Sequence, residues 1–135
     1  MAIDINKIIF WYTSRFGKIT YSMYGSRNGS DGTADCSGAA TTALYYAGAS
    51  KPSYLYSTMT LGGYLAANGF KRISVNQNWN AKKGDCVLMS WGADMSQSGG
   101  AGGHVGFMVS DTQFISCDYW TAGQAGTAIS QHDWN

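Results

Sequence analysis

The chain has 135 residues, with nine Lys or Arg against eight Asp or Glu, which gives a net charge of +1. This length allows one hydrophobic core and is too short for two ordinary domains, so we expect a single domain over residues 1–135. Charged residues make up 13% of the chain, about half of the roughly 25% found in ordinary soluble proteins. A surface that binds nucleic acid is therefore not expected, whereas neutral polar residues suit sugars or short peptides.

The N-terminal segment does not have the sequence pattern of a signal peptide. Its apolar run is interrupted by Asp4, Lys7 and Arg15, and no window of about 18 apolar residues occurs anywhere in the chain. The sequence predicts neither a secretory signal peptide nor a membrane insertion, and we expect synthesis in the cytoplasm.

Three helices are expected in the first half of the chain. Apolar residues recur at helical spacing from Asp4 to Phe16, with Asp4 as candidate N-cap and Gly17 as the stop. A stripe of small residues runs from Asp35 to Gly48, so Cys36 lies at or next to the start of a second helix. A third helix is expected from Ser57 to Asn68.

The segment Tyr21–Ala34 is rich in Gly, Ser and Asn, which predicts a surface loop of the kind that often lines a binding site. Oxygen-bearing side chains at Asn28, Asp31 and Asp35 raise the alternative of a calcium site. Their spacing does not match an EF-hand, so we favour structural turn chemistry and expect no metal.

Strands are expected in the second half, because short β-prone segments alternate there with Asn- and Gly-rich turns. Helices followed by strands predict an α+β fold with an antiparallel sheet. The Gly-rich segment Ser96–Gly103 predicts a tight or flexible loop just before His104. The expected strands are Phe70–Val75, Asp85–Trp91, His104–Ser110, Gln113–Asp118 and Thr127–Ser130.

The three cysteines, Cys36, Cys86 and Cys117, are odd in number and far apart, which fits neither a disulfide framework nor a zinc site. At the first turn of a helix, the macrodipole and free backbone N–H groups should lower the pKa of the Cys36 thiol and make it nucleophilic. The same N–H groups could bind an oxyanion. The alternative is that Cys36 is a small buried hydrophobe among alanines.

A nucleophilic cysteine needs a base, and the chain has two histidines. His104 begins an otherwise apolar strand, and its ring should point to the face opposite Val105 and Phe107, with Gly103 and Gly106 leaving room for a substrate. His132 lies in a polar tail and is expected to be a solvated surface residue.

The strand after His104 offers a residue to orient its ring. If the connecting turn has an odd number of residues, Ser116 and Asp118 share the face of His104 and Cys117 points away. We prefer Asp118, because a charge-assisted hydrogen bond is stronger, with Ser116 as the fallback. The competing interpretation is that Asp118 merely ends an edge strand.

Several motifs resemble the NlpC-type, papain-like cell-wall cysteine peptidases, and above all the catalytic domains of phage endolysins that act as peptidoglycan amidases or endopeptidases. The resemblance covers nearly the whole chain and implies a papain-like fold, with N-terminal helices packed on an antiparallel sheet of about five strands. It also implies that Cys36 is the nucleophile and His104 the base. The motifs are Tyr21–Met23, DCSG at 35–38, Trp79–Asp85, GDCVLMSW at 84–91, GAGGH at 100–104 and GGHVGF at 102–107.

The resemblance implies a bacteriolytic domain that cuts an amide bond of bacterial peptidoglycan after release from the host cytoplasm, as a monomer and without a cofactor. Tyr21, Ser37 and Gly103 are the expected substrate contacts. The family often has a histidine where this chain has Ser116, which leaves the third catalytic residue between Asp118 and Ser116. Related lysins usually carry a C-terminal wall-binding module, so we expect the domain to come from a longer lysin.

The cleaved bond is left open by the motifs. A stem-peptide or cross-bridge endopeptidase is slightly favoured, and an N-acetylmuramoyl-L-alanine amidase would use the same pair of residues. Two alternatives come from other classes: a non-catalytic wall-binding module, and a papain-like acyltransferase that excludes water.

Overall fold

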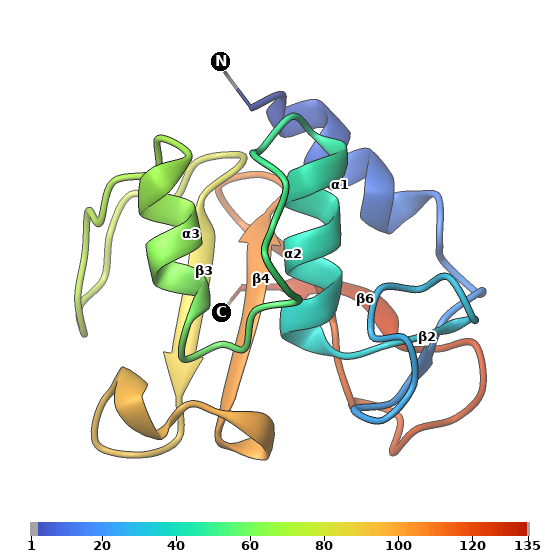
Figure 1. Ribbon diagram of the computed structural model, residues 1–135. Helices are drawn as coiled ribbons and strands as arrows, with labels where there is room; N and C mark the ends of the chain where they lie inside the picture. Colours follow the sequence, from blue (N-terminus) through green and yellow to red (C-terminus); the bar gives the residue numbers. More distant parts are fainter. Residues whose placement is uncertain (1–2, 135) are drawn as a thin grey trace.

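The computed structural model describes residues 3–134 and has an α+β architecture (Figure 1). Within these residues a four-stranded antiparallel sheet, in the order β3-β4-β5-β6, packs against three helices, and a short parallel pair stands apart from it. The elements are α1 (Ile5–Thr13), β1 (Thr20–Tyr21), β2 (Thr33–Ala34), α2 (Cys36–Tyr46), α3 (Leu61–Ala67), β3 (Cys86–Ser90), two 3-10 turns (Met95–Gln97 and Gly100–Gly102), β4 (Gly103–Met108), β5 (Gln113–Cys117) and β6 (Ile129–Asp133).

Helix α1 begins as predicted, because the side chain of Asp4 accepts a hydrogen bond from the Asn6 N–H. It ends at Thr13, earlier than the predicted Phe16, in a series of turns that runs to Gly17. Its buried face carries Ile8, Ile9, Trp11 and Tyr12. Ile8, Trp11 and Tyr12 anchor the helix to the core that α2 and the sheet share.

Helix α2 is the central helix and lies in front of the sheet in Figure 1, in contact with α1, β4 and β5. Asp35 caps it by accepting a hydrogen bond of 2.8 Å from the Gly38 N–H. Ala39, Ala40 and Ala43 are fully buried. Their small side chains allow the helix axis to approach the sheet closely, which fixes the position of the helix start at Cys36.

The hairpin between β4 and β5 has the register expected from the sequence. The Val109 N–H bonds the Gln113 carbonyl across the turn, and Gly106 pairs with Ser116. Val105 and Cys117 therefore face the helices and belong to the core cluster, while Ser116 faces the other way with His104. Strand β5 lies between β4 and β6, so Asp118 does not end an edge strand.

Three predictions of the secondary structure are wrong. Residues Phe70–Val75 form no strand, because Ile73 and Val75 are exposed and find no strand to pair with. The segment Tyr21–Ala34 is not entirely loop, since its first residue belongs to β1 and its last two form β2, and these strands pair in parallel. The main sheet consequently has four strands rather than about five.

Among the remaining elements, two differ most from their predicted bounds. The third helix starts at Leu61, because the Thr60 hydroxyl accepts from the Ser57 N–H and holds the preceding residues in a turn. The last strand is β6, Ile129–Asp133, which begins later and ends later than predicted. Over residues 3–134 we find no helix with the length and apolar character needed to cross a membrane.

Candidate active site

Cys36 is the first residue of α2, and only 3% of its surface is exposed. Its Sγ lies 3.8 Å from the Thr58 hydroxyl oxygen. The Tyr21 hydroxyl and the Ser37 backbone N–H also donate hydrogen bonds that favour the thiolate. Three groups able to donate a hydrogen bond thus favour the thiolate at the helix N-terminus, where a transient negative charge would form.

The prediction that the helix N-terminus lowers the pKa of Cys36 is wrong. Burial raises the pKa of this thiol above its usual value, and the neighbouring Asp35 carboxylate raises it further. The hydrogen bonds from Thr58, Tyr21 and Ser37 oppose these effects without overcoming them. At neutral pH Cys36 is therefore a neutral thiol, and it needs a base before it can attack.

His104 is held by a chain of hydrogen bonds on the face of the sheet predicted for it. Its Nε2 lies 3.0 Å from the Ser116 hydroxyl oxygen, and Ser116 donates to the Asp118 carboxylate over 3.1 Å. Ser130, on β6, donates to the same carboxylate oxygen. Asp118 and Ser116 are thus both connected to His104, with the serine between the carboxylate and the ring.

This chain of hydrogen bonds defines the tautomer of His104. A serine hydroxyl has one proton, and that of Ser116 is donated to Asp118. Ser116 can only accept from the imidazole, so Nε2 carries the proton and Nδ1 has a free lone pair. Burial lowers the pKa of His104, and the Asp118 carboxylate partly offsets this effect. At neutral pH the ring is neutral and able to accept a proton.

The two groups lie at the same end of the molecule. Figure 1 shows that α2 begins at the end where β4 begins, and α2 packs directly on β4 and β5. Beneath Cys36, the Cys117 thiol donates to the Ala34 carbonyl within the core. Burial raises the pKa of Cys117 strongly, so it stays protonated and plays no part at this site.

The residues expected to contact substrate have different surroundings. Tyr21 packs edge-on against Tyr119, with ring centroids 5.6 Å apart, beside Cys36. Ser37 is buried, and its hydroxyl accepts a hydrogen bond from Arg27. The open space predicted at Gly103 is absent, because a Cβ there would lie 2.5 Å from the Ser98 carbonyl oxygen.

The space predicted at Gly106 is also filled, by the chain itself. A Cβ at this position would lie 2.4 Å from the Phe114 ring. Both glycines therefore permit close packing within the protein. The prediction that they leave room for a substrate is wrong.

Arg27 connects the loop before α2 to the loop that carries Thr58, and our sequence analysis did not predict this role. Its Nε lies 2.8 Å from the Asp35 carboxylate, and another of its nitrogens donates to Ser37. It also donates to the backbone carbonyls of Leu55 and Tyr56. No local sequence pattern marked Arg27, which lies eight residues before the helix cap Asp35, and none marked Thr58 or Ser130.

His132 is not the solvated tail residue that the sequence predicted. It lies on β6 and is partly buried, with its ring stacked on Trp120 at 4.3 Å between centroids. Its Nε2 is buried and has no hydrogen-bond partner within residues 3–134. It pairs across the sheet with Phe114 rather than with the Cys36 region.

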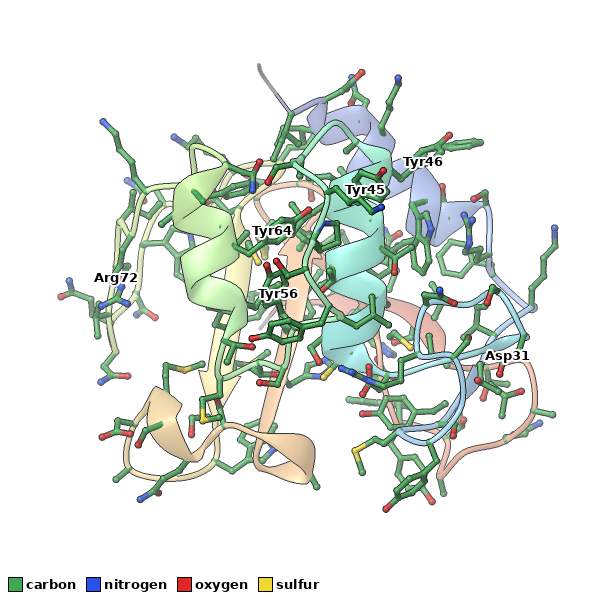
Figure 2. All side chains as sticks on the ribbon, viewed as in Figure 1. Asp31, Tyr45, Tyr46, Tyr56, Tyr64 and Arg72 are labelled. Carbon is green, nitrogen blue, oxygen red and sulfur yellow. The ribbon has the colours of Figure 1, made fainter. Side chains whose placement is uncertain are left out.

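The acidic loop before α2 shows the turn chemistry that we favoured over calcium binding. Asp31, labelled in Figure 2, accepts hydrogen bonds from the backbone and hydroxyl groups of both Ser26 and Thr33. These donors hold the pKa of Asp31 well below its usual range. Asn28 similarly accepts from the Ser30 N–H.

Comparison of the sequence with known proteins identifies the family of this chain. Residues 4–135 match the model of the bacteriophage peptidoglycan hydrolases. The chain belongs to this family. It is also 37% identical, over 133 residues, to a lysin of Pneumococcus phage Dp-1, an alignment that covers 98% of this chain and 42% of that lysin. The chain thus spans about two fifths of that relative's length.

Proposed function

We propose that this domain hydrolyses an amide bond of bacterial peptidoglycan, with Cys36 as nucleophile and His104 as general base. The observation that carries the proposal is the chain from His104 through Ser116 to Asp118, which leaves Nδ1 with a free lone pair. His104 lies near the start of β4, and Cys36 is the first residue of α2. These two element starts lie at the same end of the molecule, and α2 packs on β4. Membership of the phage peptidoglycan hydrolases supplies the substrate class.

Catalysis begins from a neutral thiol and a neutral imidazole. His104 Nδ1 takes the Cys36 proton as Sγ attacks the amide carbonyl carbon, and the carbonyl π electrons move to oxygen. The Cys36 backbone N–H has no acceptor within residues 3–134, so it is available to stabilise the resulting oxyanion. The imidazolium then protonates the leaving amine, the C–N bond breaks, and a thioester remains on Cys36.

Hydrolysis of the thioester restores the enzyme. His104, again neutral, removes a proton from water as the water attacks the thioester carbonyl. The C–S bond breaks, the Cys36 thiolate regains its proton from the imidazolium, and the new carboxyl group leaves. Thr58 and Tyr21 hold the thiolate during both transfers, because their hydroxyls already lie against the sulfur.

We propose Asp118 as the third residue, acting through Ser116. As His104 becomes an imidazolium, positive charge develops at Nε2–H, and the carboxylate stabilises it across the intervening hydroxyl. Tyr21 is the proposed substrate contact near the sulfur. We place this arrangement in a papain-like fold of the NlpC type, which delivers the nucleophile from a helix N-terminus and the base from a neighbouring strand.

Among the possible bonds, we propose one within the stem peptide or cross-bridge, with the N-acetylmuramoyl-L-alanine amide as the alternative. The domain would act on the wall after release from the host cytoplasm. A non-catalytic wall-binding module is the competing function of another class. The unprotonated Nδ1 of His104 favours the catalytic function over the wall-binding one, because binding alone requires no general base.

Digestion of purified peptidoglycan tests the proposal. We expect the wild type to release fragments with new amino termini and Cys36→Ala to release none, while the matched variant Cys86→Ala, checked for folding by circular dichroism, retains activity. Mass spectrometry identifies the bond: stems that begin at L-alanine indicate the amidase, and split stems or bridges indicate the endopeptidase. Equal cleavage by Cys36→Ala would refute the mechanism, and binding without cleavage by any variant would favour the wall-binding module.

A further inference from the structure

A second feature of the molecule lies apart from Cys36 and contributes nothing to the mechanism above. A groove of about 870 Å³ runs between strand β3, helix α3 and the segment Phe70–Gln77. Three of the exposed large hydrophobic side chains line it: Ile73 at 60%, Val75 at 57% and Trp91 at 68% exposure. Gathering exposed apolar residues in one concave place is typical of a binding surface.

The wall of this groove is the free edge of the sheet. Strand β3 pairs with β4 on one side, and the Trp91 N–H bonds the Gly102 carbonyl. Because hydrogen bonding alternates along an antiparallel strand, the backbone groups of Cys86, Leu88 and Ser90 point away from β4. Within residues 3–134 they have no backbone partner outside the sheet. An unpaired row of this kind accepts an extended peptide.

The charges of the groove select the kind of peptide. The lining also holds two carboxylates, each with donors of its own: Asp85 accepts from the Trp79 indole N–H and the Lys82 backbone N–H, and Asp94 accepts from the Ser96 backbone N–H. Lys71 and Arg72, by contrast, are exposed and form no ion pair within the described part of the chain. Figure 2 shows Arg72 on the segment beyond α3, on the side away from α2.

We infer that the groove binds a peptide stem of peptidoglycan as an added strand along β3, with a stem carboxylate held by Lys71 and Arg72. This inference rests on the proposed function, whose substrate carries such stems. The edge groups of Cys86, Leu88 and Ser90 recur at every second residue, about 6.8 Å apart, which is the backbone repeat of an extended peptide. The exposed ring of Trp91 and the side chain of Ile73 provide apolar contacts along the stem.

The position of the groove relative to His104 makes it a specificity site rather than part of the reaction. Met89, which lines the groove, is the direct cross-strand partner of His104. The groove edge therefore lies one strand, about 4.8 Å, beyond β4. A stem bound there would hold the peptidoglycan next to the catalytic end of the sheet. The bound stem itself would not contact the reacting atoms.

The test uses the non-cleaving Cys36→Ala protein and a purified soluble stem tetrapeptide with free carboxylates, followed by amide chemical shifts in NMR. We expect shifts at Cys86, Leu88 and Ser90 and saturable binding. The double substitution Lys71→Glu and Arg72→Glu should weaken binding at least fivefold. The control substitutions Lys7→Glu and Lys51→Glu, which change the net charge equally on exposed residues elsewhere, should not. A stem whose carboxylates are amidated should bind the Cys36→Ala protein as weakly as the unmodified stem binds the variant with Lys71→Glu and Arg72→Glu.

The outcomes separate this inference from the proposed function. If the wild type digests peptidoglycan while the stem shifts no amide of β3, or the groove variant binds it equally well, the inference is wrong and the proposed function stands. If the stem binds the groove but wild-type protein cuts no wall, the proposed function fails instead. The alternative occupant of the groove is a second copy of the chain, which sedimentation at several protein concentrations tests. A dimer that is disrupted by the groove variant and not by the control substitutions would overturn the inference.

Discussion

The Nε2 atom of His104 lies 3.0 Å from the Ser116 hydroxyl oxygen, and that hydroxyl donates onward to Asp118. The carboxylate thus reaches the imidazole through a serine. Because the serine proton is committed to Asp118, the serine fixes the histidine tautomer as a direct carboxylate contact would. The strength of the connection depends on both Ser116 and Asp118.

Ser116→Ala should reduce kcat about 10- to 100-fold, since it removes the acceptor of Nε2–H and separates Asp118 from the ring. Asp118→Asn should have an effect of similar size. Ser130→Ala, which removes a donor to Asp118 without touching His104, should have a much smaller one. Steady-state digestion of soluble wall fragments measures all three, and full activity in both Ser116→Ala and Asp118→Asn would show that the chain of hydrogen bonds has no role.

The pH dependence of kcat/KM should report the protonation of His104. Burial lowers its pKa below the usual 6.5, so the neutral base persists below that pH, and activity should fall only as the pH drops further. Asp118 raises this pKa, so Asp118→Asn should move the acid limb to still lower pH. An acid limb above 6.5, or one that moves upward in Asp118→Asn, contradicts this assignment.

The same shift makes the fold sensitive to acid. The folded state binds the His104 proton less tightly than the unfolded state, so the stability it contributes is present above pH 6.5 and is lost as the pH falls below it. Denaturation midpoints of the wild type should drop from pH 7 to pH 5 by more than those of His104→Gln. An equal drop in both proteins would rule out His104 as the cause.

Thr58→Val should raise the pKa of Cys36 further, because it removes a hydrogen bond that favours the thiolate while keeping the shape of the side chain. We expect alkylation of Cys36 by iodoacetamide at pH 8 to slow about 3- to 10-fold. Thr112→Val, at an exposed position in the β4–β5 turn, is the control. Unchanged alkylation in Thr58→Val would mean that the hydroxyl does not stabilise the thiolate.

Arg27→Met should destabilise the fold by about 2 kcal/mol or more, because it leaves the Asp35 carboxylate and two backbone carbonyls without their partner. Urea denaturation followed by circular dichroism measures the loss. Arg72→Met, at an exposed arginine that forms no ion pair within residues 3–134, should change stability by less than about 0.5 kcal/mol. Equal effects of the two substitutions would show that the buried contacts of Arg27 contribute nothing.

Much of this arrangement was predictable from local patterns. The small-residue stripe that begins at Asp35 placed Cys36 at a helix start, and the short turn after β4 placed Ser116 and Asp118 beside His104. Both inferences needed only the periodicity of one helix and one hairpin. They succeeded because the residues concerned are close in sequence.

Other features depend on contacts between distant segments, which periodicity does not reveal. Thr58 reaches Cys36 from 22 residues away, and its loop is held by Arg27. Burial under these loops raises the thiol pKa, which a rule based on the helix N-terminus alone predicts in the wrong direction. Residues Phe70–Val75 look like a strand by composition, yet tertiary packing leaves them across a groove from β3.

The most direct test of the central claim compares rates of wall digestion by the wild type, Cys36→Ala, His104→Ala and the double variant, with new amino termini counted in each. Residues that act as one catalytic unit show non-additive losses. We predict that each single variant loses at least about a thousandfold in rate and that the double variant is no slower than either. Retained activity in Cys36→Ala or His104→Ala, or losses that multiply in the double variant, would contradict a cysteine and histidine acting together.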